Sequence, residues 1–191
     1  MKDLKLSVRP ERVLRAHYPA HAAVDPEVRA TAEAMAAHAL EIAVPVAWAR
    51  QVPIDALVVT SATLSYSLRG CFAAQLFLVT LGPRLDQRVT ELFEAMDGLE
   101  GLFLDTAGWL ALQSALGALR RRLGVRARAA GHRLTRRVGP GYLDWPIEEQ
   151  PALVGTLTAG AALPGIEVLE SGAILPEKTL TGLFGLVPNK E

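Results

Sequence analysis

The sequence is poor in the residues that build several common kinds of site. Cys71 is the single cysteine among 191 residues, which excludes an internal disulfide and a zinc or iron–sulfur centre built on cysteines. Because Cys71 precedes an apolar run, a buried inert thiol is favoured over a reactive one. Metal-ligand spacing is also missing from the histidines, which are His17, His21, His38 and His132. We therefore expect no metal to be held by this chain.

The chain also lacks a long uninterrupted apolar run, a recognisable nucleophile–base pair and a glycine-rich phosphate loop. A membrane-spanning helix needs about 18 or more apolar residues in a row, so no membrane span is expected. The first residues are not followed by the apolar segment of a signal peptide, which predicts a cytoplasmic protein. No catalytic acid or base belonging to this chain is predicted.

Acidic residues are absent between Asp105 and Asp144, whereas eight arginines lie between Arg120 and Arg137. Such a segment can form an electrostatic face for an acidic partner, or it can be a solvated helix end. No aromatic residue lies among residues 120–133 for base stacking, so nucleic acid is not the expected partner.

Half of the residues are apolar and the formal net charge is zero. Disordered chains combine low hydrophobicity with high net charge, so this chain is predicted to fold. We expect residues 1–24 to be a lead-in with a short strand and irregular structure, and residues 25–191 to form a single domain. Helices interleave with short strands in that domain, which predicts the α+β class with an antiparallel or mixed sheet.

Apolar periodicity and chain-breaking residues predict the order of the elements. Helices are expected at residues 25–39, 85–96, 99–123 and 147–157. Strands are expected at residues 44–52 (at a sheet edge), 54–60, 72–81, 132–138, 166–169 and 179–187. Periodicity alone leaves a helix open for residues 72–81. The segment that joins residue 123 to Gly131 is expected to be short, basic and exposed.

The stretch from Arg136 to Gln150 has the most informative local pattern. Gly-Pro-Gly at residues 139–141 disfavours both a helix interior and a central strand, yet large aromatic residues follow it directly. Asp144 and Pro146 are expected to begin the next helix, with Asp144 as its cap. A strand end, a glycine loop and a helix start together predict a place where a small ligand meets backbone N–H groups.

These residues resemble a known family. Arg137-x-Gly139-x-Gly141-Tyr142 is similar to the Arg-x-x-x-Gly-Tyr signature of the activation (reactivation) domain of cobalamin-dependent methionine synthase, and most of all to its free-standing bacterial relatives. Further similar segments occur in the family's order at residues 80–83, 104–108 and 169–179. The resemblance extends over residues 26–187 and implies a curved sheet surrounded by helices.

The resemblance also implies a ligand, S-adenosylmethionine. Arg137 would bind its carboxylate, because a guanidinium presents paired donors in the geometry that a carboxylate accepts. Gly139 and Gly141 would let backbone groups reach the adenosine, and Tyr142 would lie against it. The alternative is that Arg137 is one member of the basic run and Tyr142 a core aromatic residue. Lys178 is either a structural or a partner-facing residue.

Two departures from the family pattern bear on this ligand. Gln113 stands where the family has a ligand-contacting glutamate, and a neutral amide lacks the charge that strengthens a hydrogen bond to an ammonium group. The chain also stops at Glu191, before the segment in which the family supplies a further tyrosine. Weak, altered or lost binding of S-adenosylmethionine is the resulting hypothesis.

The resemblance implies a partner that carries cobalamin, namely cobalamin-dependent methionine synthase or another corrinoid methyltransferase, with flavodoxin as a further acidic partner. The first functional hypothesis is a reactivation module that supports reductive remethylation of cob(II)alamin. The second is a non-catalytic adaptor or subunit that has lost S-adenosylmethionine binding. A third, RNA binding through the basic segment, would show itself by its salt dependence.

Overall fold

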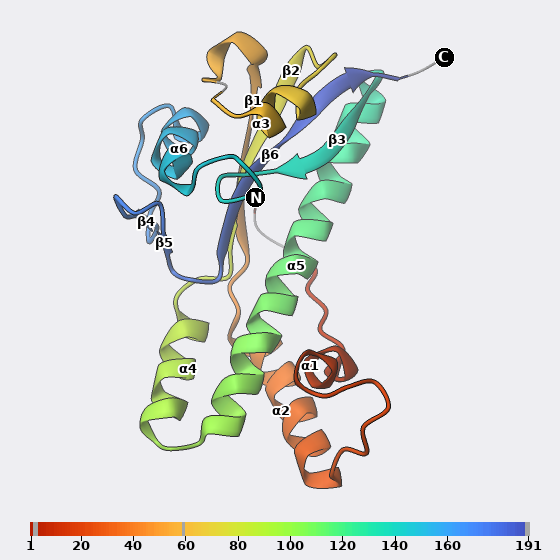
Figure 1. Cartoon of the computed structure of the whole chain (residues 1–191), viewed down its shortest axis with the longest axis vertical. Helices are drawn as coiled ribbons and strands as arrows, with labels where there is room; N and C mark the ends of the chain where they lie inside the picture. The colour runs from red at the N-terminus through yellow and green to blue at the C-terminus, as the bar shows by residue number, and fades with distance from the viewer. Residues whose placement is uncertain (2–3, 59, 190–191) are drawn as a thin grey trace.

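The structure is a computed structural model that describes residues 1, 4–58 and 60–189. Its main sheet has the strand order β1-β2-β6-β3, and every pairing in it is antiparallel. The strands are β1 (Val46–Pro53), β2 (Ala73–Thr80), β3 (His132–Val138) and β6 (Thr179–Pro188). Helices surround this sheet (Figure 1), so the predicted α+β class with an antiparallel sheet is confirmed.

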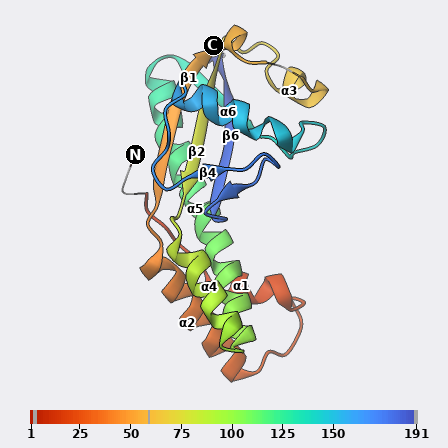
Figure 2. The same cartoon turned by 90° about the vertical axis from the view of Figure 1, so that its left-hand side faces the viewer.

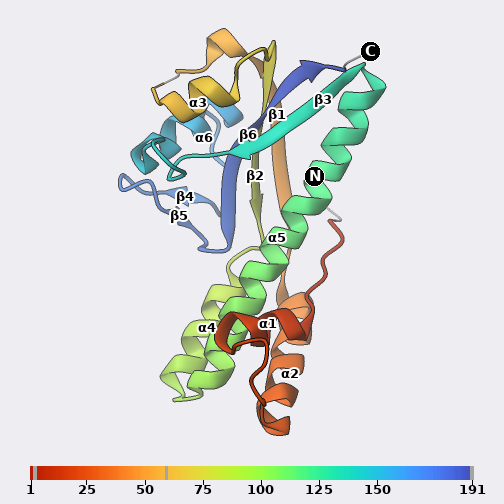
Figure 3. The same ribbon diagram turned by 45° about the vertical axis from the view of Figure 1, so that its right-hand side comes forward.

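The long helix α5 (Gly98–Ala129) connects two parts of the molecule. Its 32 residues span about 48 Å at the usual helical rise of about 1.5 Å. The N-terminal half packs with α1 (Pro10–His17), α2 (Pro26–Ile42) and α4 (Arg84–Glu94), and the C-terminal half lies along β3 (Figure 3). By length and composition α5 could cross a membrane, but 56% of its most apolar window is buried inside the protein. It is therefore the core helix of this fold.

The two faces of the sheet have separate apolar cores. Phe77 and Phe184 stack in the core that includes α5, with ring centroids 5.0 Å apart. On the other face Leu78 and Leu183 pack with Trp145 and with helix α6 (Gln150–Thr158). Figure 2 shows α6 and the short pair β4 (Glu167–Val168) and β5 (Ile174–Leu175) in front of the sheet, with α5 behind it.

Several predicted elements are confirmed. Residues 132–138 form β3 with the predicted bounds, and residues 72–81 contain the buried strand β2, so the helical alternative is excluded. Strand β1 lies at the sheet edge as predicted. Asp25 caps α2 by accepting a hydrogen bond of 2.8 Å from the backbone N–H of Glu27. Burial raises the pKa of the Cys71 thiol, which fits the inert alternative.

Other predictions were wrong because tertiary contacts decide the outcome. Residues 10–17 form helix α1, whose Val13 and Leu14 enter the α5 core, in place of a strand and irregular chain. Residues 54–56 form a 3₁₀ turn in place of a strand, and Val59 lies outside the described residues. The basic segment after Leu123 continues α5 to Ala129, because Leu123 and Ala127 extend its buried stripe.

Asp144 was also assigned to the wrong helix. Its carboxylate accepts hydrogen bonds from the backbone N–H groups of Ala62 and Thr63, at 2.9 and 3.1 Å, and so adds to the cap of α3 (Ala62–Ser67), whose N-cap residue is Ser61. The helix that follows it in sequence begins as a 3₁₀ turn at residues 147–149 without a side-chain cap. Asp144 therefore fastens the glycine loop to a distant element.

Candidate functional site

A β-bulge sets the direction of Arg137. Leu134 pairs with Leu186 and Arg137 with Phe184, so β3 has one residue more than β6 between the two pairs. The Thr135 hydroxyl accepts a hydrogen bond of 2.8 Å from the backbone N–H of Gly185 at this irregularity. A bulge redirects the side chains that follow it. Because directly opposed residues share a sheet face, Arg137 lies on the face of Phe184 and α5.

The loop after β3 is folded against itself. The backbone N–H of Gly141 donates to Trp145 O at 2.8 Å, and that of Tyr142 donates to Gly139 O at 3.1 Å. The buried Trp145 anchors the loop, and its Nε1 donates to Glu149 at 2.9 Å. These backbone donors are therefore satisfied within the loop rather than free for a ligand.

A cavity of about 290 Å³ lies between this loop and the middle of α5. Strand β3 ends at Val138, opposite Leu183, so the first residues of β6 have no β3 partner and border the cavity. The lining residues come from α5, the loop, α6 and β6: Trp109, Arg137, Val138, Gly139, Pro140, Gly141, Tyr142, Ile147, Gln150, Thr179, Leu180 and Thr181.

Arg137 is the charged group of this cavity. Its side chain is half-buried, and burial lowers the pKa of the guanidinium while the nearby Tyr142 raises it. Among the described residues it forms no ion pair and no hydrogen bond within the usual distances. A half-buried cation without a counter-ion is costly unless an anion from outside completes it. The position therefore suits a bound carboxylate or phosphate.

Aromatic and neutral polar groups surround this cation. Tyr142 is 52% and Trp109 43% exposed at the cavity, so both rings can pack against a planar ligand. The Thr181 hydroxyl donates a hydrogen bond of 2.9 Å to the buried Gln150 Oε1. None of the lining residues is acidic. The arrangement can hold an anionic group and an aromatic ring of a ligand. It has no carboxylate that could pair with a positively charged group of the ligand.

Arg137, Gly139, Gly141 and Tyr142 all line this cavity, and their binding of a ligand stays a prediction. Gln113 is exposed on α5, four residues after Trp109 on the same helix face, but it does not line the cavity. Sequence reasoning missed Trp109, Gln150 and Thr181. Of these, Trp109 alone had a signal in the sequence, because it precedes the predicted Gln113 by four residues and so lies on the same helix face.

The two loop glycines accommodate the protein's own atoms. A Cβ at position 139 would lie 3.0 Å from Thr181 O, and one at position 141 would lie 3.0 Å from Ile147 Cδ1. Gly141 also has a φ of 80°, which L side chains rarely adopt. Glycine at both positions therefore lets the loop close against β6 and Ile147, which shapes the cavity.

Lys178 is a buried structural residue next to this site. Its Nζ lies 2.6 Å from Asp105 and 3.7 Å from Asp86, and it stands 5.6 Å from the centre of the Trp109 ring. A Cβ at Gly108 would come within 3.1 Å of Lys178 Cε, so glycine there makes room for the lysine. The partner-facing alternative is thus excluded, and the ion cluster supports one wall of the cavity.

The ion cluster also affects Asp86. Burial raises the pKa of the Asp86 carboxyl, although the backbone N–H of Glu177 and the Lys178 cation both oppose that change. Glu177 N donates to Asp86 Oδ2 at 2.6 Å.

Within the described part of the chain, no group of three or more His, Cys, Asp or Glu side chains is arranged to hold a metal ion.

Comparison with known proteins gives a partial likeness to a solved structure. No protein-family model and no curated protein matches the sequence. A crystal structure of the MetH reactivation domain bound to AdoHcy is similar with a TM-score of 0.47 and 16% sequence identity, over 62% of this chain and 41% of that chain. The chain thus spans about two fifths of that protein's length, and any activity of that domain is a proposal for this chain.

Proposed function

We propose that this chain binds S-adenosylmethionine in the cavity beside Arg137 and serves as a reactivation module for a corrinoid methyltransferase. The observation that supports this most is the Arg137 guanidinium, which is half-buried beside two partly exposed aromatic rings and has no anionic partner among the described residues. The first candidate partner is cobalamin-dependent methionine synthase, within the cytoplasm.

In this proposal the residues bind and orient, and the cofactors carry the chemistry. Arg137 holds the ligand carboxylate, and Tyr142 and Trp109 pack against the adenosine. Gln150 and Thr181 lie at the polar edge of the cavity. S-adenosylmethionine, when bound, would supply the methyl group and leave as S-adenosylhomocysteine. The partner's cobalamin would be the methyl acceptor once a donor such as flavodoxin had reduced it by one electron. No proton transfer by this chain is required.

The exposed arginines of α5 and β3 support a negatively charged partner. Exposed arginines stand on the C-terminal half of α5 and on β3, at Arg121, Arg128, Arg133 and Arg136. A surface of one sign steers an oppositely charged protein and raises the association rate. We propose that this arginine-rich segment receives the cobalamin-carrying domain of the methyltransferase, or flavodoxin as the electron donor.

Isothermal titration with S-adenosylmethionine tests the site. Losing a charge-assisted hydrogen bond costs about 1.5–3 kcal/mol, so Arg137→Ala should bind about 10- to 150-fold more weakly than wild type. Arg137→Lys should recover part of this loss, because lysine keeps the charge without the paired donors. The exposed neighbour Arg136→Ala is the control and should bind like wild type. Equal affinities for Arg137→Ala and Arg136→Ala would refute the assignment.

A second candidate function is an adaptor or subunit of a corrinoid methyltransferase that no longer binds S-adenosylmethionine. The lack of acidic side chains among the described lining residues favours it, because the ligand's ammonium group then has no carboxylate partner. This candidate predicts no detectable S-adenosylmethionine binding by wild type, together with intact binding to the methyltransferase.

A further inference from the structure

A second cavity, of about 420 Å³, lies on the α5 side of the sheet near the other end of that helix. It shares no lining residue with the cavity beside Arg137. Arg126, which lines it, follows Trp109 by 17 residues, or about 25 Å along the helix axis. The two cavities are therefore separate sites.

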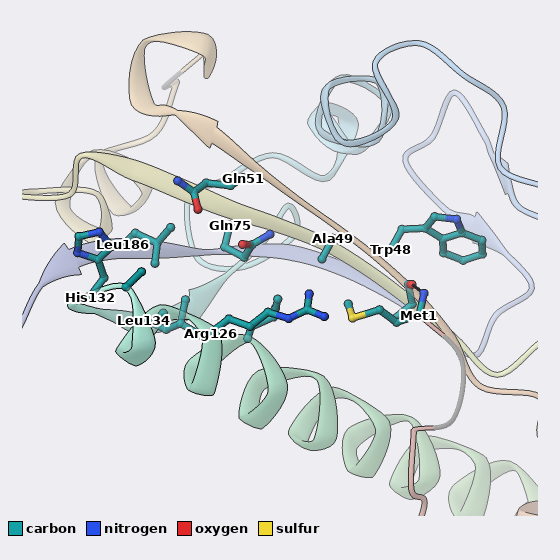
Figure 4. A pocket seen from close by; sticks show the side chains of 13 residues that line it. Met1, Trp48, Ala49, Gln51, Gln75, Arg126, His132, Leu134 and Leu186 are labelled. Atoms are coloured by element: carbon teal, nitrogen blue, oxygen red, sulfur yellow. Dashed lines mark hydrogen bonds between the residues drawn. The ribbon is translucent and has the colours of Figure 1, made fainter.

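The floor of this second cavity consists of small and amide side chains. Ala47 and Ala49 of β1 leave space beside α5, whose C-terminal half packs chiefly on β3. Gln51 lies directly opposite Gln75 in the β1–β2 register, so both amides are on the same face. Leu123, Ala127, Leu134 and Leu186 add an apolar wall, and His132 stands at one end (Figure 4). The cavity is thus apolar with a pair of amides on its floor.

Arg126 and the N-terminal ammonium of Met1, which donates a hydrogen bond to Ala47 O, are the cations that line this cavity. Figure 4 shows the Arg126 side chain extending from α5 along the cavity toward Met1. Among the described residues the Arg126 side chain has no hydrogen bond or ion pair within the usual distances, and no acidic residue lines the cavity. An arginine fork at the mouth of an apolar cavity is complementary to a carboxylate on an apolar body. Gln75 Nε2 donates to Leu76 O at 3.4 Å, so its second N–H and the Gln51 amide are the further donors that line the cavity.

We propose that this second cavity binds a small organic acid, in which one carboxylate meets Arg126 and the paired glutamines while a compact apolar body fills the space over Ala47 and Ala49. Its volume is within the range of about 300–1,000 Å³ that is typical of ligand sites. Phosphate is the weaker candidate, because the apolar wall would gain nothing from it. This proposal does not depend on S-adenosylmethionine binding.

The test uses the full chain, with 4-fluorophenylacetate as the probe. Binding is measured by fluorine NMR of the probe and by the NMR signals of the Gln51 and Gln75 side-chain amides. We expect saturable binding that shifts both amide signals, and binding at least about 10-fold weaker for the neutral 4-fluorophenylacetamide. Arg126→Gln should weaken the acid by about the same factor. Arg128→Gln, an equal charge change at an exposed position that does not line the cavity, should leave it unchanged.

A second variant fills the space without touching the charge. Ala49→Leu should abolish probe binding and leave S-adenosylmethionine affinity as in wild type. Equal binding of the acid and the amide, an equal loss in the two arginine variants, or displacement of the probe by inorganic phosphate at similar concentration would overturn the proposal. So would an absence of probe binding.

Discussion

Replacing the buried Lys178 by methionine should destabilise the protein strongly. The lysine side chain is 1% exposed, and its Nζ lies 2.6 Å from Asp105 and 3.7 Å from Asp86. Removing one partner of a buried ion pair costs about 3–5 kcal/mol, because the opposite charge stays behind without compensation. Asp105 is 36% exposed and can gain some hydration, so we expect a loss near the lower bound, about 3 kcal/mol.

The measurement is urea unfolding of wild type and Lys178→Met, with the slope checked for constancy. In a chain of this length about 3 kcal/mol corresponds to a melting temperature lower by about 6–12 °C. The control is Arg88→Met, which removes the exposed pair with Glu91 at 2.9 Å and should cost less than about 1 kcal/mol.

A double variant separates the charge from the packing. Lys178→Met combined with Asp105→Leu replaces the closest ion pair by apolar side chains, which is often near neutral for a buried pair. It should therefore recover at least half of the stability lost in the single variant. A single variant that loses less than about 1 kcal/mol, or a double variant no more stable than the single one, would refute the reasoning.

Three further predictions concern local contacts. Gly124→Ala should stabilise the protein by about 1 kcal/mol in urea unfolding, because alanine favours the helix α5. Gly108→Ala should give no gain or a loss, because its Cβ would lie 3.1 Å from the Lys178 side chain; equal gains in the two variants would contradict this. Burial raises the folded-state pKa of Asp86, so its contribution to stability is present at low pH and lost as pH rises through that pKa. A carboxyl NMR titration should show the raised pKa, and Asp86→Asn should remove this loss of stability with rising pH. Hydrogen bonds from Thr63 and Ala62 lower the pKa of Asp144, so its contribution to stability is present at neutral pH and lost as pH falls through that pKa. Asp144→Ala removes both acceptor oxygens, so it should flatten the acid side of the stability curve and speed hydrogen exchange at Ala62 and Thr63; unchanged exchange there would contradict the role of Asp144 in the cap.

Local chemistry decided the elements that the sequence predicted well. Strand β2 is a mostly apolar run ended by Gly82-Pro83, and β3 lies between Gly131 and the Gly-Pro-Gly loop. In both cases breaker residues fix the bounds, and the pattern between them needs no distant partner. The shared location of Arg137 and Tyr142 could be predicted for the same reason, since a tight loop keeps them close.

Features that depend on distant residues could not be predicted. The bulge before Arg137 arises from the pairing register of β3 with β6. The hydrogen bonds of Asp144 depend on α3, which lies about 80 residues earlier in the chain. Trp109 reaches the cavity because α5 crosses the sheet, which the helical pattern alone does not specify. The continuation of α5 to Ala129 likewise follows from burial against β3 and β6, which outweighs the repulsion among its arginines.

Thermal unfolding with and without S-adenosylmethionine decides whether Arg137 receives the ligand. Ligand at about 100 times its dissociation constant should add about 2.7 kcal/mol to the stability of the wild type and of Arg136→Ala. Arg137→Ala at the same concentration should gain far less. A wild type that gains nothing, or an Arg137→Ala variant that gains as much as Arg136→Ala, would contradict binding of the methyl donor at this cavity.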